Sequence, residues 1–369
     1  MQMNLLKQEE MPPEPEREFT MALGSLRSRT TDSENTRRTI QQEQEQFCIQ
    51  YQELQKRTSY LAQLGDIPGG GGSAGSGTSG AGSPSPAGQA ELIGKLTKDK
   101  QLLENTLKQQ VTLISRRRLQ LLDRLGEALA AIGQLQQRLL GEHLVAWRRS
   151  QQLTGNGRPS ANGCIEQLQE WCEALAEMIW QNRQQVERVE QLCAQLPLQQ
   201  AGELKERALM LRSQYSTLLS TLVHGSFVIE KQPPQVMKTN TRFTSTVRLL
   251  VGVKLNVHMT PPLVKVAIIS ESQANTLIRT KKLGLAECSG EILNNAGAME
   301  YNAVSRQLSL HFRNMQLKKI KRAEKKGTES VMDEKFALLF HSQFKIGTSE
   351  TFDVWVSLIV ILLKVFFFD

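Results

Sequence analysis

The chain has 369 residues, of which 40% are hydrophobic and 22% charged, and its formal net charge is +8 at pH 7. This apolar content supports two or three folded domains, so the composition excludes a wholly disordered protein. The five cysteines, an odd number at irregular spacings, exclude a disulfide framework and a regular zinc pattern. The start, MQMNLLKQEEMPPEPE, lacks the basic and apolar regions of a secretory signal, and we therefore expect a reducing environment.

Residues 1–32 are polar and proline-rich near their start, which predicts a disordered segment. From Ser33 the pattern becomes that of a coiled-coil helix. Its apolar residues are seven apart, with Gln and Glu between them, at Ile40, Phe47, Leu54 and Leu61.

The next stretch, residues 66–90, is dominated by Gly and Ser. Within it GSGTSG, residues 75–80, has the spacing of a dinucleotide-binding turn. That turn requires a strand before it and a helix after it, and here both flanks have the same Gly/Ser composition. The sequence therefore predicts a flexible insert between two helices.

Three further segments show apolar residues three and four apart, the spacing of one helical face. They cover residues 91–150, 165–196 and 204–222, with LTGNGRPSANG as a turn after the first and Pro197 as a stop after the second. The clearest series consists of Ile165, Leu168, Cys172, Leu175, Ile179, Asn182, Val186, Val189, Cys193 and Leu196.

Four helices joined by short or flexible connections predict an antiparallel four-helix coiled coil over residues 33–224. Four separate coiled-coil arms are an alternative, but each would need a partner of its own. Asn182 in the apolar series either fixes the helix register or is a tolerated polar residue. Cys172 and Cys193 in the same series are expected to be buried structural thiols.

After Gly225 the pattern changes to short β-rich runs separated by Pro, Gly and Asn, which predicts a β-sandwich over residues 225–353. In SRQLSLHFR the alternation is regular, and Leu308, Leu310 and Phe312 are expected to face one way. The runs that we expect to form strands are SFVIE, RFTSTVRLLVG, KLNVHM, VKVAIIS, GEILNNAGAMEY, RQLSLHF and EKFALLFHSQF.

Several long strings in both halves resemble one family. SFVIEKQPPQVMKTNTRFTSTVRLLVGVKLNVHM, ECSGEILNN, LSLHFRNMQLKKIKR and ESVMDEKFALLF are similar to the DNA-binding domain of the signal transducers and activators of transcription (STATs). LVAWRRSQQLTGNG, LQEWCEALAEMIWQNRQQ and EQLCAQLP are similar to the helical part of the same family. The likeness is closest to the branch activated by prolactin and growth-hormone type cytokines, and it extends from about Ser33 to Val354, apart from the Gly/Ser insert.

The resemblance implies a four-helix coiled coil followed by an immunoglobulin-like (p53-like) β-sandwich that binds double-stranded DNA, here incomplete at its C-terminal end. It also implies cytoplasmic and nuclear locations, and receptors, regulators and importin as partners of the helices. In the family a phosphotyrosine-binding domain supports a homodimer that clamps DNA. This sequence contains no match to that domain, so we expect the homodimer to be doubtful for this chain.

The basic stretch RNMQLKKIKRAEKK is the first candidate DNA contact, because Lys and Arg replace counterions on phosphate groups. The alternative is an ordinary solvated face. Part of the stretch, KKIKR, also has nuclear-import composition, and its cations are Lys318, Lys319, Lys321 and Arg322. The whole candidate set here consists of Lys318, Lys319, Lys321, Arg322, Lys325 and Lys326.

The second candidate is KTNTRF, where the resemblance places Lys238 and Thr239 at a strand edge beside the DNA backbone, with Arg242 next to them. A lysine and a hydroxyl at a strand end position phosphates without reading bases. The alternative is that these are exposed residues of an ordinary strand.

The sequence favours no enzyme, cofactor, metal or small-molecule substrate. The five histidines are scattered, and no phosphate-binding loop, nucleophile elbow or kinase signature is present. A competing function is a protein-interaction module that acts through its helices, as a non-productive or dominant-negative isoform.

Residues 354–369, VWVSLIVILLKVFFFD, depart from the family text and form an apolar tail. The run from Val354 to Phe368 has fifteen residues and contains Lys364, whereas a membrane-spanning helix needs roughly twenty apolar residues. We expect no membrane anchor. The β-branched part, VWVSLIVI, is instead expected to form a strand over the sandwich, and a splice-variant or intron-read-through origin of the tail is our hypothesis.

Overall fold

The computed structural model describes residues 14–65, 86–153, 164–198, 201–234, 236–280, 288–321, 335–347 and 350–363. The chain divides into two compact units. We name the first the sandwich unit, which consists of Met1–Arg27, Ala130–Gln181 and Gln214–Asp369. The second is the helical unit, which consists of Ser28–Leu129 and Asn182–Ser213.

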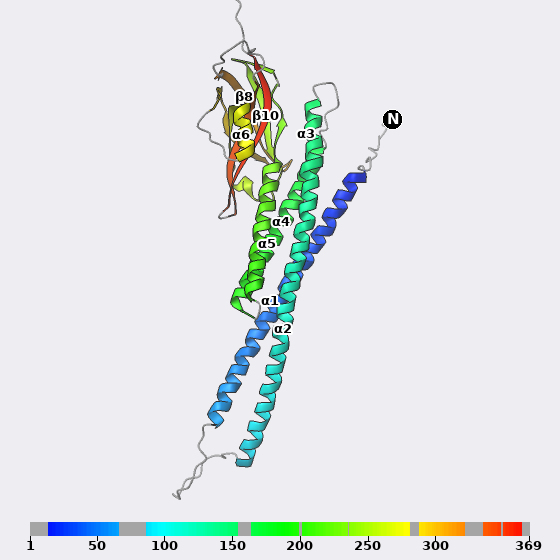
Figure 1. Ribbon diagram of the computed structural model, residues 1–369, viewed down its shortest axis with the longest axis vertical. Coiled ribbons are helices and arrows are strands. Elements are labelled where there is room, and N and C mark those ends of the chain that lie inside the picture. Colours follow the sequence, from blue (N-terminus) through cyan, green and yellow to red (C-terminus); the bar gives the residue numbers. More distant parts are fainter. Residues whose placement is uncertain are drawn as a thin grey trace, which may run out of the picture. The chain divides into compact units, whose positions relative to one another are not determined.

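The first part of the chain is helical, as its spacing predicted (Figure 1). One long run consists of an α-helix, a single π-helical segment and another α-helix in direct succession. The helices are α1 (Glu14–Gly65), α2 (Pro86–Arg138), the π-helix η1 (Leu139–His143), α3 (Leu144–Leu153), α4 (Cys164–Gln195) and α5 (Ala201–Ser226).

In the helical unit, polar pairs fix the helix directions. Arg29 pairs with Glu127, and Arg117 with Glu43, so α1 and α2 are antiparallel. Arg212 pairs with Glu187 on the neighbouring helix, and because a short connection joins α4 to α5, these two helices are antiparallel as well. Apolar residues of all four helices are buried between them, including Ile40, Phe47, Ile114, Leu121, Leu125, Val186, Val189, Leu204, Ala208 and Leu211.

The buried polar and thiol groups of the predicted apolar series have defined surroundings. Asn182 is fully buried, and its Nδ2 donates a hydrogen bond to Thr30 Oγ1 at 3.1 Å. Its register role stays a prediction. Cys172 and Cys193 are buried, as expected, and burial raises the pKa of both thiols, which lowers their thiolate fraction.

The helix α1 begins at Glu14, so the prediction of disorder through residue 32 is wrong for residues 14–32. Phe19, Leu23 and Leu26 of this stretch are buried. They are three and four apart and so form a helical face that extends the heptad pattern toward the N-terminus. Pro15 is compatible with the helix because it lies in the first turn, where its missing N–H is not needed.

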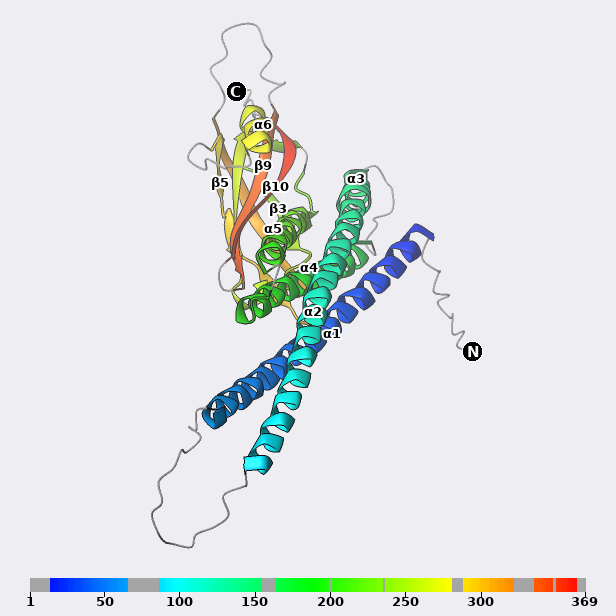
Figure 2. The same ribbon diagram turned by 60° about the horizontal axis from the view of Figure 1, so that its bottom comes forward.

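The second part of the chain forms two antiparallel-rich sheets, each of five strands among the described residues (Figure 2). One sheet has the order β1-β3-β8-β5, with β7 also paired to β8, and the other has the order β2-β10-β9-β4-β6. The strands are β1 (Phe227–Lys231), β2 (Val236–Lys238), β3 (Arg242–Leu249), β4 (Leu263–Ser270), β5 (Gly290–Leu293), β6 (Ala296–Ala298), β7 (Glu300–Asn302), β8 (Gln307–Ile320), β9 (Lys335–Ile346) and β10 (Glu350–Leu363).

Within the sandwich one local prediction is wrong, and one helix was not predicted. The run KLNVHM forms turns and a short 3-10 helix, η3 (Val257–Met259), because Asn256 adopts a positive φ of 56° that ends any extended conformation. The residues ESQANTLIRT form a helix that was not predicted, α6 (Glu271–Thr280). Its Leu277 packs on Ile269 and Leu339 of the adjacent sheet.

The regular alternation expected in β8 holds only in part. Leu308 and Phe312 are buried, but Ser309 is buried too and Leu310 is only half-buried. The β3–β8 register shifts between Phe243 and Ser245, and β8 carries the extra residue. This bulge lies after Phe312 and moves the inward positions there to the other set of alternate residues, so that Met315 and Leu317 are buried.

The apolar run VWVSLIVI lies in β10, and the prediction of a strand is confirmed. This strand pairs with β9 from Glu350 to Ile361, and its last residues also pair with β2 in parallel. Within the described ranges, no helix is both long and apolar enough to cross a membrane.

Candidate nucleic-acid interface

The turn between β2 and β3 carries the first group of candidate contacts. Lys238 ends β2, Thr239 lies in the turn, and Arg242 begins β3. Asn240 has a positive φ of 66°, which asparagine tolerates better than most residues, and this conformation closes the turn. The Thr241 hydroxyl donates to the Lys238 carbonyl at 2.5 Å and stabilises the closed form.

The turn is fixed to β8 by hydrogen bonds. The Asn240 N–H donates to the Leu317 carbonyl at 2.6 Å, and the Leu317 N–H donates to the Thr241 carbonyl at 3.3 Å. Gln316 Nε2 donates to the Asn240 carbonyl at 3.1 Å. These bonds hold the turn directly beside the residues that precede Lys318 and Lys319.

The end of β8 carries the second group. Lys318 and Lys319 are exposed on the strand, and Lys321 is exposed just after it. The neighbouring strand β5 fixes this end, because Lys319 is in register with Glu291 and the Lys321 N–H donates to the Ser289 carbonyl at 2.8 Å. The backbone under the lysines is therefore ordered by strand pairing.

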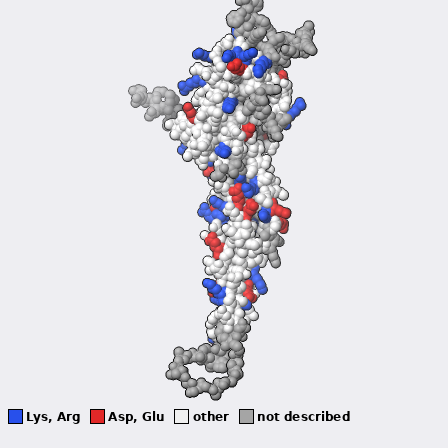
Figure 3. Space-filling model, turned by 90° about the vertical axis from the view of Figure 1, so that its left-hand side faces the viewer, with Lys and Arg blue, Asp and Glu red and all other residues white. Residues whose placement is uncertain are grey.

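The two groups form one cationic surface, consisting of Lys238, Arg242, Lys318, Lys319 and Lys321. All five side chains are exposed. Lys318 Nζ forms an ion pair with Glu291 at 3.4 Å, and with both side chains more than half exposed this pair contributes little stability. Figure 3 shows Lys and Arg gathered at the upper end of the sandwich, with few acidic side chains among them.

The structure thus brings together candidates that are about eighty residues apart in sequence. Lys238, Thr239 and Arg242 lie beside Lys318, Lys319 and Lys321, with Thr239 half-buried and the others exposed. Arg322, Lys325 and Lys326 lie outside the described residues.

Sequence reasoning missed two residues that build this surface, Asn240 and Gln316. The Asn in KTNT is a turn signal that could have revealed the first. No local signal marks the second, because its partner is 76 residues away.

The chemistry of this surface suits phosphate groups. Ammonium and guanidinium groups at strand ends attract a polyanion, and the Thr239 hydroxyl adds a polar group that can donate to phosphate. Among the described residues, no group of three or more His, Cys, Asp or Glu could hold a metal ion.

Comparison with known proteins decides the family. Residues 20–219, more than half of the chain, match the family model "STAT transcription factor, coiled-coil domain". The chain belongs to the STAT family. Residues 231–361 match a second model of this family, "STAT protein, DNA binding domain", which contains the cationic surface up to Lys321.

The matched ranges also correct the expected limits of the likeness. The STAT coiled-coil match begins at residue 20, where we expected about Ser33. The STAT DNA-binding match continues to residue 361, beyond Val354 and into β10.

One curated relative is the "Signal transducer and transcription activator" of Drosophila melanogaster, 43% identical over 202 residues. The alignment covers 53% of this chain and 26% of the relative, so this chain spans about a quarter of the relative's length. Among solved structures, a crystal structure of STAT2 in complex with IRF9 is similar at a TM-score of 0.37 and 18% identity, over 56% of this chain and 96% of that one.

Proposed function

We propose that this chain is a sequence-specific DNA-binding transcription factor of cytokine-responsive JAK–STAT signalling, in the branch activated by prolactin and growth-hormone type cytokines. The observation that supports DNA binding is the joining of the β2–β3 turn to the end of β8, which collects five exposed cations on one surface. Double-stranded DNA is the proposed ligand of that surface.

The contacts are proposed to position the phosphate backbone. Lys238, Lys319 and Lys321 would each replace condensed counterions on DNA, and the Thr239 hydroxyl would donate to phosphate. The binding constant should then fall steeply with salt concentration.

The test is the salt dependence of binding to duplex DNA, measured by fluorescence anisotropy with the whole chain. Replacing Lys319 and Lys321 by Ala should flatten the slope of log K against log salt by about 2, because each phosphate contact contributes about 0.9. A matched control replaces Lys56 and Lys108, two exposed lysines of the helical unit, by Ala. An equal flattening in both variants would show that net charge, and not this surface, determines binding.

The same lysines are proposed to take part in nuclear import through importin, which would place the protein in both cytoplasm and nucleus. Fluorescent fusions of the Lys319/Lys321 variant and its control separate the two roles. Nuclear entry that persists in a variant defective in DNA binding would show that these lysines serve DNA alone.

A second function, docking of other proteins on the helices, is favoured by exposed apolar side chains on the helical unit. Ile49 of α1 is 67% exposed and Leu102 of α2 is 69% exposed. A small cavity of about 130 Å³, lined by residues that include Glu43, Gln110 and Leu113, lies on the same two helices. Regulators or receptors would be captured by the whole chain and lost on changing Ile49 and Leu102 to Asp, with DNA binding unchanged.

A further inference from the structure

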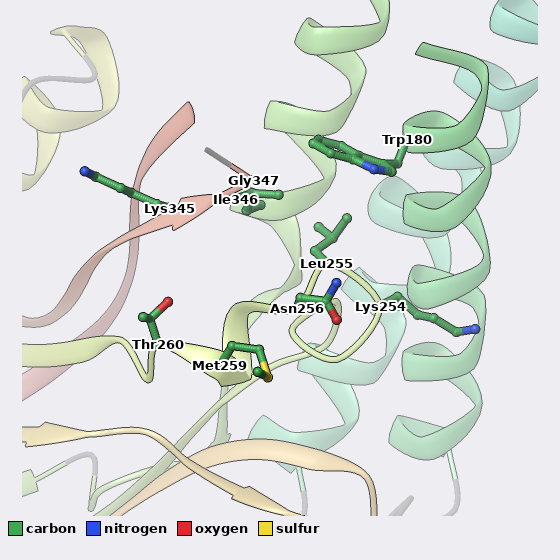
Figure 4. Close-up of a pocket in the computed structure, with 9 residues that line it drawn as sticks. All are labelled: Trp180, Lys254, Leu255, Asn256, Met259, Thr260, Lys345, Ile346 and Gly347. Atoms are coloured by element: carbon green, nitrogen blue, oxygen red, sulfur yellow. The ribbon is translucent and has the colours of Figure 1, made fainter. Parts of the chain in front are cut away.

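A groove of about 390 Å³ lies in the sandwich unit at the point where β9 ends (Figure 4). Its walls come from three separate parts of the sequence. They are Trp180 of α4, residues 254–260 between β3 and β4, and residues 345–347 at the end of β9.

The walls are held by specific local structure. Gly347 has a φ of +67°, and a Cβ at this position would lie 3.2 Å from Cη2 of Trp180, so the indole rests directly on the glycine. On the opposite wall Asn256 adopts a positive φ, and the Val257 N–H donates to the Gly252 carbonyl at 2.9 Å. Leu255 and Val257 are buried and anchor that wall in the sandwich.

The lining is cationic and apolar. It contains two lysines, Lys254 and Lys345, and no carboxylate. Figure 4 shows these lysines on opposite sides of the lining residues. Lys254 also pairs with Glu177 at 3.3 Å, and this carboxylate weakens the attraction of Lys254 for an anionic ligand. Lys345 is exposed.

Two large apolar side chains of the lining, Met259 and Trp180, reach solvent. Met259 is 74% exposed and Trp180 is half-buried. Methionine adapts its shape to different apolar partners, and an indole offers a wide, rigid contact face. A small hydrophilic anion would leave both of these contacts unused.

The groove is distant from the cationic surface. At the start of β9, Lys335 pairs with Ile361 of β10, which also pairs with Val236 of β2. At the other end of β9, Ile346 pairs with Glu350. Lys335 and Ile346 are eleven residues apart, which corresponds to roughly 35 Å along the strand. An occupant of the groove would therefore leave the β2–β3 turn accessible.

We propose that the groove binds a short acidic peptide segment of a partner protein. An apolar side chain of the peptide lies on Trp180 and Met259, and its flanking carboxylates lie near Lys254 and Lys345. The charge complementarity selects an acidic partner, and the exposed thioether and indole select an apolar anchor within it.

The experiment measures fluorescence anisotropy of a fluorescein-labelled peptide, two Leu flanked on each side by two Glu, against the whole chain. Lys345→Glu should weaken binding about fivefold or more, because an attraction becomes a repulsion. Met259→Ser should weaken it about fivefold through lost apolar contact. Lys265→Glu, the same charge change at an exposed residue of β4 outside the groove, should leave the affinity within about twofold.

The control ligands are the peptide with Ser in place of Leu, the peptide with Lys in place of Glu, and ATP. Weak binding of all three supports the proposal. Equal loss in Lys345→Glu and Lys265→Glu, equal binding of the Ser peptide, or preferential ATP binding that depends on Lys345 would each overturn it.

Two further measurements complete the test. Sedimentation of the chain alone that shows a dimer, abolished by Met259→Ser, would assign the groove to a second copy instead and would also overturn the proposal. Duplex DNA binding should be unchanged in Lys345→Glu. A loss of DNA binding would make the groove part of the DNA-binding surface and would overturn the proposal of a separate site.

Discussion

Arg118 in the helical unit and Arg248 in the sandwich unit are both only 1% exposed, but different groups satisfy their charges. Arg118 donates to the carbonyls of Leu192 and Leu196 at 2.9 and 3.0 Å, and to Gln44 Oε1 at 2.5 Å. Among the described residues no carboxylate forms an ion pair with it. Burial lowers the pKa of its guanidinium, which nevertheless stays charged at neutral pH.

Arg248 has the opposite kind of environment. Its Nη1 lies 3.3 Å from Glu230 of β1 and 3.5 Å from Glu166 of α4, and its Nε and Nη2 donate to Gln169 Oε1. The same Gln169 donates to the Arg306 carbonyl at 2.8 Å. Arg248 therefore joins the sandwich to the start of α4 through charged groups.

The difference shows two ways to bury a cation. At Arg118 the guanidinium is stabilised by the partial negative charge of the carbonyls at the end of α4, as expected for a helix C-terminus. At Arg248 carboxylates supply full counter-charges. Removing Arg118 leaves neutral acceptors without donors, whereas removing Arg248 also leaves carboxylates without a cation.

The largest expected effect is that of Arg248→Met, which should lower the free energy of unfolding by about 3–4 kcal/mol, the lower part of the range for a buried ion pair, because Glu166 is half-exposed and can be hydrated. Denaturant unfolding followed by circular dichroism measures it. Adding Glu230→Gln and Glu166→Gln should restore part of the loss. If the triple variant is no more stable than the single one, the carboxylates do not account for the effect.

Arg118→Met should cost less, about 1–3 kcal/mol, because it orphans carbonyl and amide oxygens but no carboxylate. The same unfolding experiment gives the value, with Arg116→Met, a residue two positions along the same helix, as the matched control. A loss as large as that of Arg248→Met would break the comparison, since it would mean that the counter-charge is unimportant.

The sequence predicted the helices better than it predicted these groups. Spacing of three and four residues revealed all four helical stretches, but Arg118 and Arg248 are ordinary cations in sequence. Their burial depends on partners 74 to 79 residues away, which no local pattern shows. Likewise Lys318 was identified by its basic run and Lys238 through family likeness, but the hydrogen bonds that join their segments are long-range.

The missed helix α6 shows where a local signal was present but not used. Ser270 and Gln273 form a capping box, in which each side chain bonds the other residue's backbone N–H. The Asn and Thr residues of the segment favour other conformations, and the preceding strand pattern obscured the start. Packing of Leu277 on the sheet compensates for this weak helix propensity.

Asn182 is a neutral buried group of the helical unit, and it can be compared with the two buried arginines. Its Nδ2 bonds Thr30 Oγ1, but within the described residues its Oδ1 has no partner. Asn182→Leu should cost about 1 kcal/mol by leaving the Thr30 hydroxyl without that bond, and Thr30→Val added to it should recover the loss. A double-mutant cycle of unfolding free energies measures the coupling. A fully additive cycle would show that the bond contributes nothing to stability.

The smallest expected effect on stability comes from His143 of the sandwich unit, a partly buried group that titrates. Burial lowers the pKa of its imidazole, although Glu142 and Glu16 act against this and Arg138 adds to it. The ring lies 5.1 Å from that of Trp171 and 5.3 Å from that of Phe19. The surroundings thus favour the neutral form over the protonated one.

A base with a lowered pKa binds fewer protons when folded than when unfolded, so this contribution to stability is present above the ordinary histidine pKa of about 6.5 and is lost as pH falls below it. The thermal midpoint should therefore drop between pH 7.5 and pH 5.5, and His143→Phe should reduce that drop. His224→Gln, a change at an exposed histidine of α5, is the control and should leave the drop unchanged. An identical pH dependence in wild type and His143→Phe would contradict this prediction, because it would mean that the imidazole is as well solvated in the folded protein as in the unfolded chain. His143 would then differ from Arg118 and Arg248, whose burial requires hydrogen-bond or ion-pair partners within the fold.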